Sequence, residues 1–100
     1  MPVNQMRPIH PGEILLEEFL KPLKMSANAL SIALRIPAPR INDLVREKRG
    51  LSADTALRLA RYFGSTAQFW LNLQTAYELK IVEQQVGASI QKEIIPRQVA

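Results

Sequence analysis

The sequence predicts an all-α domain of five helices, and three observations lead to this fold class. Apolar residues recur at helical spacing along most of the chain. Helix-capping and helix-breaking residues divide that pattern into segments. We find no stretch in which apolar and polar residues alternate as they do in a strand.

The first three helices follow from local signals. The first begins at His10–Glu13 and should end or kink near Lys21, because Pro22 lacks a backbone donor. Ser26 is the expected N-cap of the second helix, which stops before Pro37. A third helix is expected over residues 38–46. The residues expected to face inward are Ile14, Leu15, Phe19, Leu20, Leu30, Ala33, Leu34, Ile41, Leu44 and Val45.

Two further helices complete the expected domain. Ser52 caps the fourth, whose inner face comprises Ala56, Leu57, Leu59, Ala60 and Phe63, and Gly64 ends it. Ser65 or Thr66 caps the fifth, which should run to about Val86 and break at Gly87. The expected organisation is therefore an N-terminal arm (1–9), a helical domain (10–86) and a loosely ordered tail (87–100).

The stretch from Ser26 to Gly50 has the pattern of a helix-turn-helix, a module that places one helix in the major groove of DNA. Ser31 is small where the two helices touch, and Ile36 fills the angle after the turn. Ile41 and Leu44 dock the second helix on the first. The same pattern also fits two helices that merely pack in a bundle. The turn lacks the glycine often found at the position of Arg35, so either Arg35 takes a strained conformation or the turn is built differently.

Composition narrows the function class. Residues 35–50 carry a net charge of +3 out of +4 for the whole chain, which is an electrostatic footprint for phosphate. Cysteine is absent, which excludes disulfides and thiolate metal sites and fits a reducing cytoplasm. His10 is the only histidine, so no catalytic constellation or metal site is expected. We expect no enzyme activity, cofactor, secretion signal or membrane span.

Several segments together resemble the HigA/VapI-type (virulence-associated protein I) antitoxins of the Xre, or lambda-repressor-like, helix-turn-helix family. The similarity covers about residues 7–83 and rests on HPGEILLEEFLKPLKMS (10–26), IPAPRINDLVREKRGLSADTALRLARYFG (36–64) and FWLNLQTAYEL (69–79). The resemblance implies a five-helix lambda-repressor-like DNA-binding domain. It also implies a cytoplasmic bacterial homodimer that binds an operator palindrome, represses its own operon and neutralises an mRNA-cleaving RNase toxin. The family commonly has Asn-Gly where Arg46-Glu47 stands, so the third helix is expected to run slightly further here.

The expected DNA contacts lie on the third helix and the loop after it. Arg40 is the first candidate for guanine or phosphate, whereas Asn42 and Asp43 suit adenine and cytosine. Ala38 and Pro39 offer only apolar contacts, so DNA shape is expected to contribute. The expected phosphate contacts are Arg46, Lys48 and Arg49, together with Ser26 and Asn28 at the start of the second helix.

The fifth helix carries an apolar band wider than one core-facing stripe, which predicts a dimer interface. A C2 dimer would set two recognition helices about 34 Å apart. The alternative is that the whole band belongs to the core of one chain. The residues expected in the interface are Phe69, Trp70, Leu71, Leu73, Tyr77 and Ile81.

Two other functions also fit the sequence. One is a solitary Xre-family transcriptional regulator without a toxin partner. The other is a protein-interaction module that has lost DNA binding, which the presence of Ala38, Pro39 and Glu47 would fit.

Overall fold

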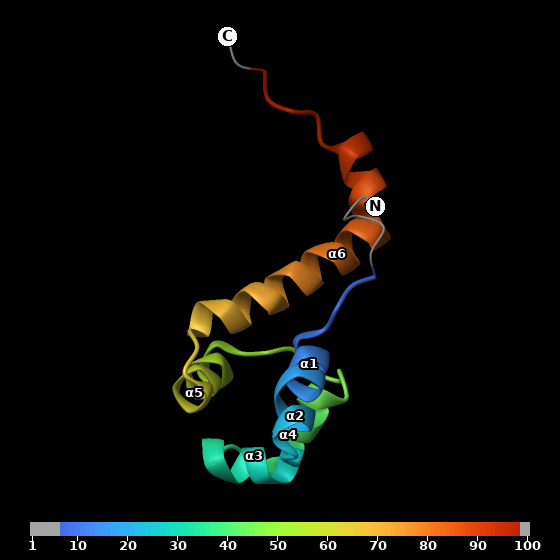
Figure 1. Ribbon diagram of the computed structural model, residues 1–100. Coiled ribbons are helices and arrows are strands. Elements are labelled where there is room, and N and C mark those ends of the chain that lie inside the picture. Colours follow the sequence, from blue (N-terminus) through green and yellow to red (C-terminus); the bar gives the residue numbers. More distant parts are fainter. Residues whose placement is uncertain (1–6, 99–100) are drawn as a thin grey trace.

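A computed structural model describes residues 7–98, and within that range it contains helices and no strand (Figure 1). Because the first three elements run on without a break, they form one helix, and the expected five-helix fold is confirmed. The elements are α1 (Pro11–Ile14), the π-helical turn η2 (Leu15–Leu20), α2 (Lys21–Leu23), α3 (Ala27–Leu34), α4 (Ala38–Val45), α5 (Ala53–Phe63) and α6 (Ala67–Glu93).

The first helix passes Pro22 and ends at Leu23, slightly later than the sequence predicted. Its regular geometry changes before the proline, where the π-helical turn makes a wider loop and the Lys21 N–H bonds to the Leu16 carbonyl. In a regular helix the proline ring would collide with the carbonyl four residues earlier, at Glu18. The wide turn immediately before Pro22 matches that constraint.

A single core joins all five helices, and α6 lies across the others before it projects beyond them (Figure 1). The Trp70 side chain is fully buried, and its ring lies 4.9 Å from Phe19 and 6.3 Å from Phe63. The Trp70 indole N–H donates to the Ser65 hydroxyl at 2.9 Å, so its polar atom is also satisfied.

Most of the expected inward residues are confirmed, but two are not. Ala33 is exposed on α3, and the Leu57 side chain on α5 is 63% exposed. Both line a shallow apolar groove between these two helices, beside Arg61 and Tyr62. Helical spacing alone could not show that no other element covers Ala33 and Leu57 on these two helices.

Among the described residues, four helices are followed by a left-handed residue, and one of these four residues is glycine. Gly64 ends α5 as expected, whereas Lys24, Arg35 and Glu47 adopt φ values of 53°, 57° and 63°. After α4, the Lys48 N–H bonds to the Asp43 carbonyl and the Glu47 N–H to the Leu44 carbonyl, which is the Schellman pattern. The expected extension of this helix is therefore wrong. It ends at Val45, because Glu47 takes the left-handed conformation that closes the helix.

The expected break at Gly87 is also wrong, because α6 continues through it to Glu93. A glycine inside a helix costs about 1 kcal/mol relative to alanine, which its neighbours can offset when they favour helix. The segment after the helix thus begins at Ile94 rather than at Gly87. Of the N-terminal arm, the structure describes residues 7–9; residues 1–6 lie outside the described range, as do residues 99–100.

Substituting alanine for glycine at two positions should have opposite effects on stability. A Cβ at Gly12 would lie 1.9 Å from the Leu44 carbonyl oxygen, so Gly12→Ala must push α1 away from α4. We expect a loss of about 3 kcal/mol, at the upper end for overpacking. A Cβ at Gly87 meets only the Glu83 Cβ at 3.8 Å, so Gly87→Ala should stabilise the helix by up to about 1 kcal/mol.

Denaturant unfolding at two protein concentrations measures both free energies and separates folding from association. A Gly12→Ala variant as stable as the wild type would contradict the close approach of α1 and α4.

Candidate DNA-binding surface

The helix-turn-helix geometry expected from the sequence is present in α3, α4 and the turn between them. Ser31 is buried where the helices touch, and its hydroxyl donates to the Asn28 carbonyl at 2.6 Å. Ile36 fills the angle after the turn, while Ile41 and Leu44 dock α4. These apolar side chains are each at most 5% exposed, so the inner face of α4 is committed to packing and its outer face is left for other contacts.

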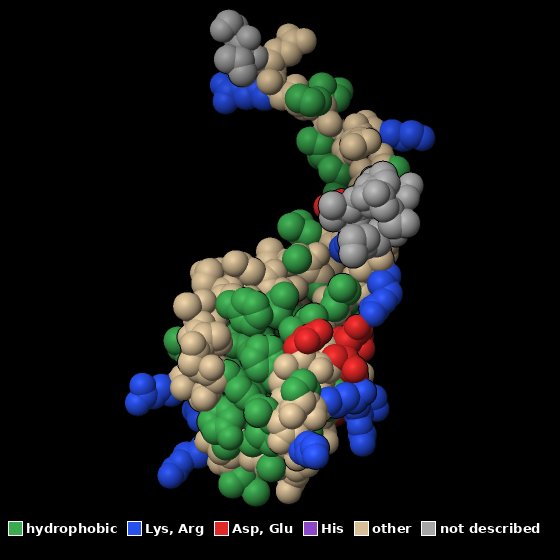
Figure 2. Space-filling view, in the orientation of Figure 1, with side chains coloured by type: hydrophobic (Ala, Val, Ile, Leu, Met, Phe, Trp, Pro, Cys, Tyr) green, Lys and Arg blue, Asp and Glu red, His purple; other side chains and the backbone are tan. Residues whose placement is uncertain are grey.

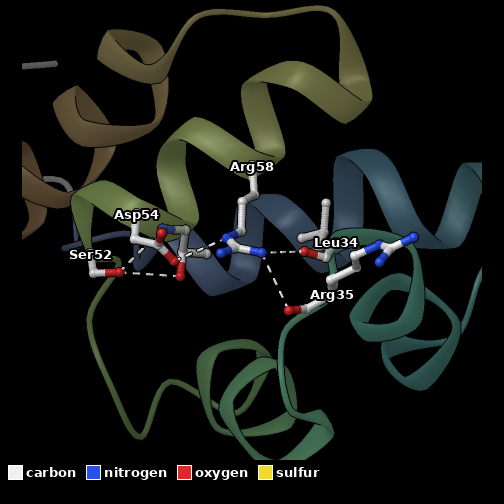
Figure 3. A network of polar contacts seen from close by, with 6 residues as sticks. Leu34, Arg35, Ser52, Asp54 and Arg58 are labelled. Carbon is white, nitrogen blue, oxygen red and sulfur yellow. Dashed lines mark hydrogen bonds and ion pairs between the residues drawn. The ribbon is translucent and has the colours of Figure 1, made fainter.

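The turn itself is held by an arginine that sequence reasoning missed. Arg35 does adopt the left-handed conformation, and the Arg58 guanidinium on α5 bonds to the Leu34 carbonyl at 2.9 Å and the Arg35 carbonyl at 3.3 Å (Figure 3). Asp54 orients this guanidinium from one helical turn away, at 3.1 Å. The Asp54–Arg58 spacing is visible in the sequence, but the reach to α3 depends on how the helices pack.

The outer face of α4 carries the expected base-contacting residues. Pro39 and Arg40 are exposed, and Ala38, Asn42 and Asp43 are half-buried. The Asn42 amide nitrogen already donates to the Ala38 carbonyl at 2.9 Å. Asn42 would therefore have to give up this bond in order to offer both of its polar atoms to an adenine.

The loop after α4 brings the expected phosphate-contacting residues next to the helix. Arg46, Lys48 and Arg49 are all exposed. Arg40 and Arg49 line the same cavity of about 300 Å³, together with Gly50, Ser52 and Thr55 near the start of α5. Arg40 is expected to contact guanine or phosphate and Arg49 to contact phosphate, and the fold brings both side chains to one hollow. The hollow lies beside the N-terminus of α5, where a phosphate oxygen is favoured.

Ser26 and Asn28 lie exposed at the start of α3. The Ser26 hydroxyl accepts the Ala29 N–H at 3.0 Å, which confirms Ser26 as an N-cap. Its oxygen is therefore part of the helix start, and its proton is left for a contact with an acceptor such as a phosphate.

His10 has a structural role at the base of this surface. Its Nδ1 accepts the Gly12 N–H at 2.9 Å as the cap of α1, and its ring makes an edge-to-face contact with Tyr77 of α6. Burial lowers the pKa of His10 below its ordinary value, opposed by the nearby Glu47 carboxylate and a hydrogen bond with the Arg49 backbone. His10 is thus kept neutral beside the loop that carries the cations.

The expected dimer-interface residues do not share one face of α6. Trp70 is fully buried in its own chain and cannot contact a partner, so its expected place in the interface is wrong. Leu71, Leu73, Tyr77 and Ile81 are half-buried, and Phe69 is 40% exposed. At about 100° per residue, Trp70, Tyr77 and Ile81 fall on the side of the helix that faces the domain.

A second apolar stripe lies further along α6 on the opposite side. Leu79, Val82, Val86 and Ile90 are between 41% and 58% exposed, and their spacing places them on one face. Figure 2 shows separate hydrophobic patches continuing along the projecting helix beyond the globular part. Within residues 7–98, no helix combines the length and apolar character needed to cross a membrane.

Fold and surface together define a helix-turn-helix protein of the lambda-repressor-like class. The chain is 64% identical over 81 residues to virulence-associated protein I of Dichelobacter nodosus, covering 81% of this chain and 75% of the relative. It is 36% identical over 76 residues to antitoxin HigA-1 of Vibrio cholerae, covering 76% and 71%. The chain belongs to the HigA/VapI-type antitoxin family. No family model matches the sequence.

A solved structure extends the comparison to a complex. The Pseudomonas aeruginosa protein PA4674, crystallised with its operator DNA, aligns with a TM-score of 0.90 at 53% identity. The alignment covers 94% of this chain and 99% of that protein. The helix-turn-helix described above is therefore shared with a protein that was solved on its operator.

The free energy of unfolding should fall as the pH drops below 6.5, the ordinary pKa of histidine, and should level off above it. The unfolded chain gains a proton at this pH, whereas folded His10 resists protonation because it is buried and its Nδ1 must accept the Gly12 N–H. The lowered pKa therefore leaves the fold unaffected well above pH 6.5 and destabilises it increasingly on acidification. Denaturant unfolding across this range measures the effect.

His10→Asn is the matched control, since asparagine caps a helix without titrating. Because the chain has a single histidine, this variant should lose the pH dependence near 6.5. An unchanged profile in the variant would show that another group is responsible.

Proposed function

We propose that this protein is a bacterial antitoxin that binds the operator of its own operon as a homodimer. It represses that operon and neutralises an mRNA-cleaving RNase toxin in the cytoplasm. The observation that carries the proposal is the alignment over 94% of the chain with PA4674, which was solved with its operator DNA. The relatives named as HigA-type antitoxins support the toxin partner.

In this proposal the outer face of α4 enters the major groove. Arg40 is exposed near the start of the helix, where recognition helices approach base edges. Its two parallel donors suit guanine O6 and N7. Ala38 and Pro39 make apolar contacts such as that with a thymine methyl, and Asp43 suits a cytosine amino group. Because Asn42 is already bonded to the Ala38 carbonyl, DNA shape carries part of the specificity.

Phosphate contacts supply most of the affinity. Arg46, Lys48 and Arg49 follow α4 directly, and Arg49 shares a hollow with Arg40 at the start of α5. Ser26 and Asn28 add contacts at the N-terminus of α3. Contacts of this kind position the protein on the duplex without reading its sequence.

The second apolar stripe of α6, called the distal stripe below, is the centre of the proposed dimer interface. Leu79, Val82, Val86 and Ile90 point away from the face that packs on the domain, so a second copy can dock there without disturbing the core. A two-fold axis pairs this stripe with itself. Phe69, Leu71, Leu73, Tyr77 and Ile81 retain some exposed surface and extend the proposed contact toward the domain.

Two substitutions separate base reading from phosphate binding. Arg40→Ala should weaken binding to the chain's own upstream DNA by about 1–3 kcal/mol, with a smaller effect on unrelated DNA. Lys48→Ala should weaken binding to all sequences alike and lower the salt slope by about 0.9. Fluorescence anisotropy at several salt concentrations measures both effects. No preference of the wild type for its upstream DNA would overturn the operator proposal, and equal operator affinity of Arg40→Ala would remove Arg40 from the reading set.

A charge in the α6 stripe should separate the dimer. Val86→Glu would bury a carboxylate between two apolar faces, and we expect the dimer dissociation constant to rise at least about tenfold, a cost of about 1.4 kcal/mol or more. Gln84→Glu adds the same charge at an exposed position on the opposite side of the helix and should leave the dimer intact. Sedimentation equilibrium distinguishes the two. Equal association of both variants, or a wild type that is monomeric at micromolar concentration, would contradict this interface.

A further inference from the structure

The motif FWLNLQ ends in Gln74, a polar residue on the domain-facing side of α6 that the proposed contacts do not use. Its side chain is only 9% exposed. Its Oε1 accepts the Leu51 backbone N–H at 2.7 Å, and its Nε2 donates to the Glu78 carboxylate at 2.8 Å. The bond to Glu78 sets the orientation of the amide, so that its oxygen faces the chain between α4 and α5.

The absence of a side chain at the neighbouring Gly50 leaves room for this amide. A Cβ at Gly50 would lie 2.9 Å from the Gln74 Nε2 and 3.2 Å from its Oε1 and Cδ. Any other residue at position 50 would have to displace the amide or the loop. Leu51 is itself 6% exposed, so an unbonded Leu51 N–H would be buried without a partner.

The loop between Arg46 and Gly50 is thus supported from outside the helix-turn-helix. Gln74 holds it at its downstream end, through Leu51. Upstream, Gly12 of α1 lies directly against the Leu44 carbonyl. Arg46, Lys48 and Arg49 are exposed on the supported segment.

We propose that Gln74 is a positioning residue for DNA binding, which holds the Arg46–Gly50 loop where Lys48 and Arg49 meet phosphate. This inference rests on the proposed function and assigns a role to a residue that touches no DNA itself. Its position also ties α6, the helix of the proposed dimer interface, directly to the DNA-contacting loop. The spacing of the two loops in a dimer is therefore set through Gln74 as well as through the core.

The test exchanges the two partners of the hydrogen bond. Gln74→Ala removes both bonds, and Gln74→Glu places one carboxylate against another at Glu78. The double variant Gln74→Glu with Glu78→Gln keeps an acceptor for the Leu51 N–H and restores the hydrogen bond between positions 74 and 78, now with the donor at 78 and with no change in net charge. Gln68→Ala is the matched control, because Gln68 is an exposed α6 glutamine whose side-chain amide donates to Asn72 on the same helix.

Three properties of the full-length protein are measured: hydrogen exchange of the Leu51 amide, operator affinity against salt, and sedimentation. For Gln74→Ala and Gln74→Glu we expect Leu51 exchange to accelerate and operator affinity to fall about tenfold, which corresponds to about 1.4 kcal/mol. The salt slope should decrease by about 0.9 for each phosphate that the displaced loop no longer meets. The double variant should recover both properties, while Gln68→Ala stays like the wild type and all variants remain dimeric.

The possible results separate the two proposals. If the wild type binds its operator but the Gln74 variants keep its affinity and salt slope, Gln74 serves the core alone and the inference is overturned, even where Leu51 exchange rises. Failure of the double variant to recover affinity would also overturn it. If the wild type shows no operator binding, the proposed function itself fails.

Discussion

The packing of one face of α6 on the helical domain is the interaction on which the rest of the structure depends. Trp70 enters the core between the first helix and α5 and makes aromatic contacts with Phe19 and Phe63. Aromatic pairs of this kind contribute about 0.5–1.5 kcal/mol beyond the burial of their area. One turn further along the same face Gln74 bonds to Leu51, and two turns further Tyr77 meets His10. The contacts that close the core thus also place the loop after α4.

The geometry of the candidate DNA surface depends on contacts that other parts of the chain make with its backbone groups. The Leu34 and Arg35 carbonyls are bonded by Arg58, the Leu44 carbonyl lies against Gly12, and the Leu51 N–H is bonded by Gln74. Each of these holds the end of a helix or a turn. As a result, the exposed basic side chains lie on segments whose backbone is already fixed. Less conformational entropy is therefore lost when they bind a phosphate.

The two faces of α6 separate two tasks. The domain-facing side, with Trp70 and Gln74, completes the fold, whereas the distal stripe with Val82 and Val86 is left half-exposed. A helix with apolar residues on both sides shows a broad band in its sequence and no single stripe. The breadth of the band in the sequence therefore could not assign Trp70 to the inner side.

Local signals in the sequence determined the class of fold, most helix boundaries and the position of the helix-turn-helix. Caps such as Ser26 and Ser52, stops such as Gly64 and the inward spacing of Ile41 and Leu44 act within a few residues, so they can be recognised in one dimension. The tertiary structure alone decided the rest. Which residues support the loop depends on contacts between segments distant in sequence, such as that of Gln74 with Leu51. Whether α6 passes Gly87 and whether Glu47 takes a left-handed turn depend on local costs of about 1 kcal/mol each, which sequence propensity does not resolve.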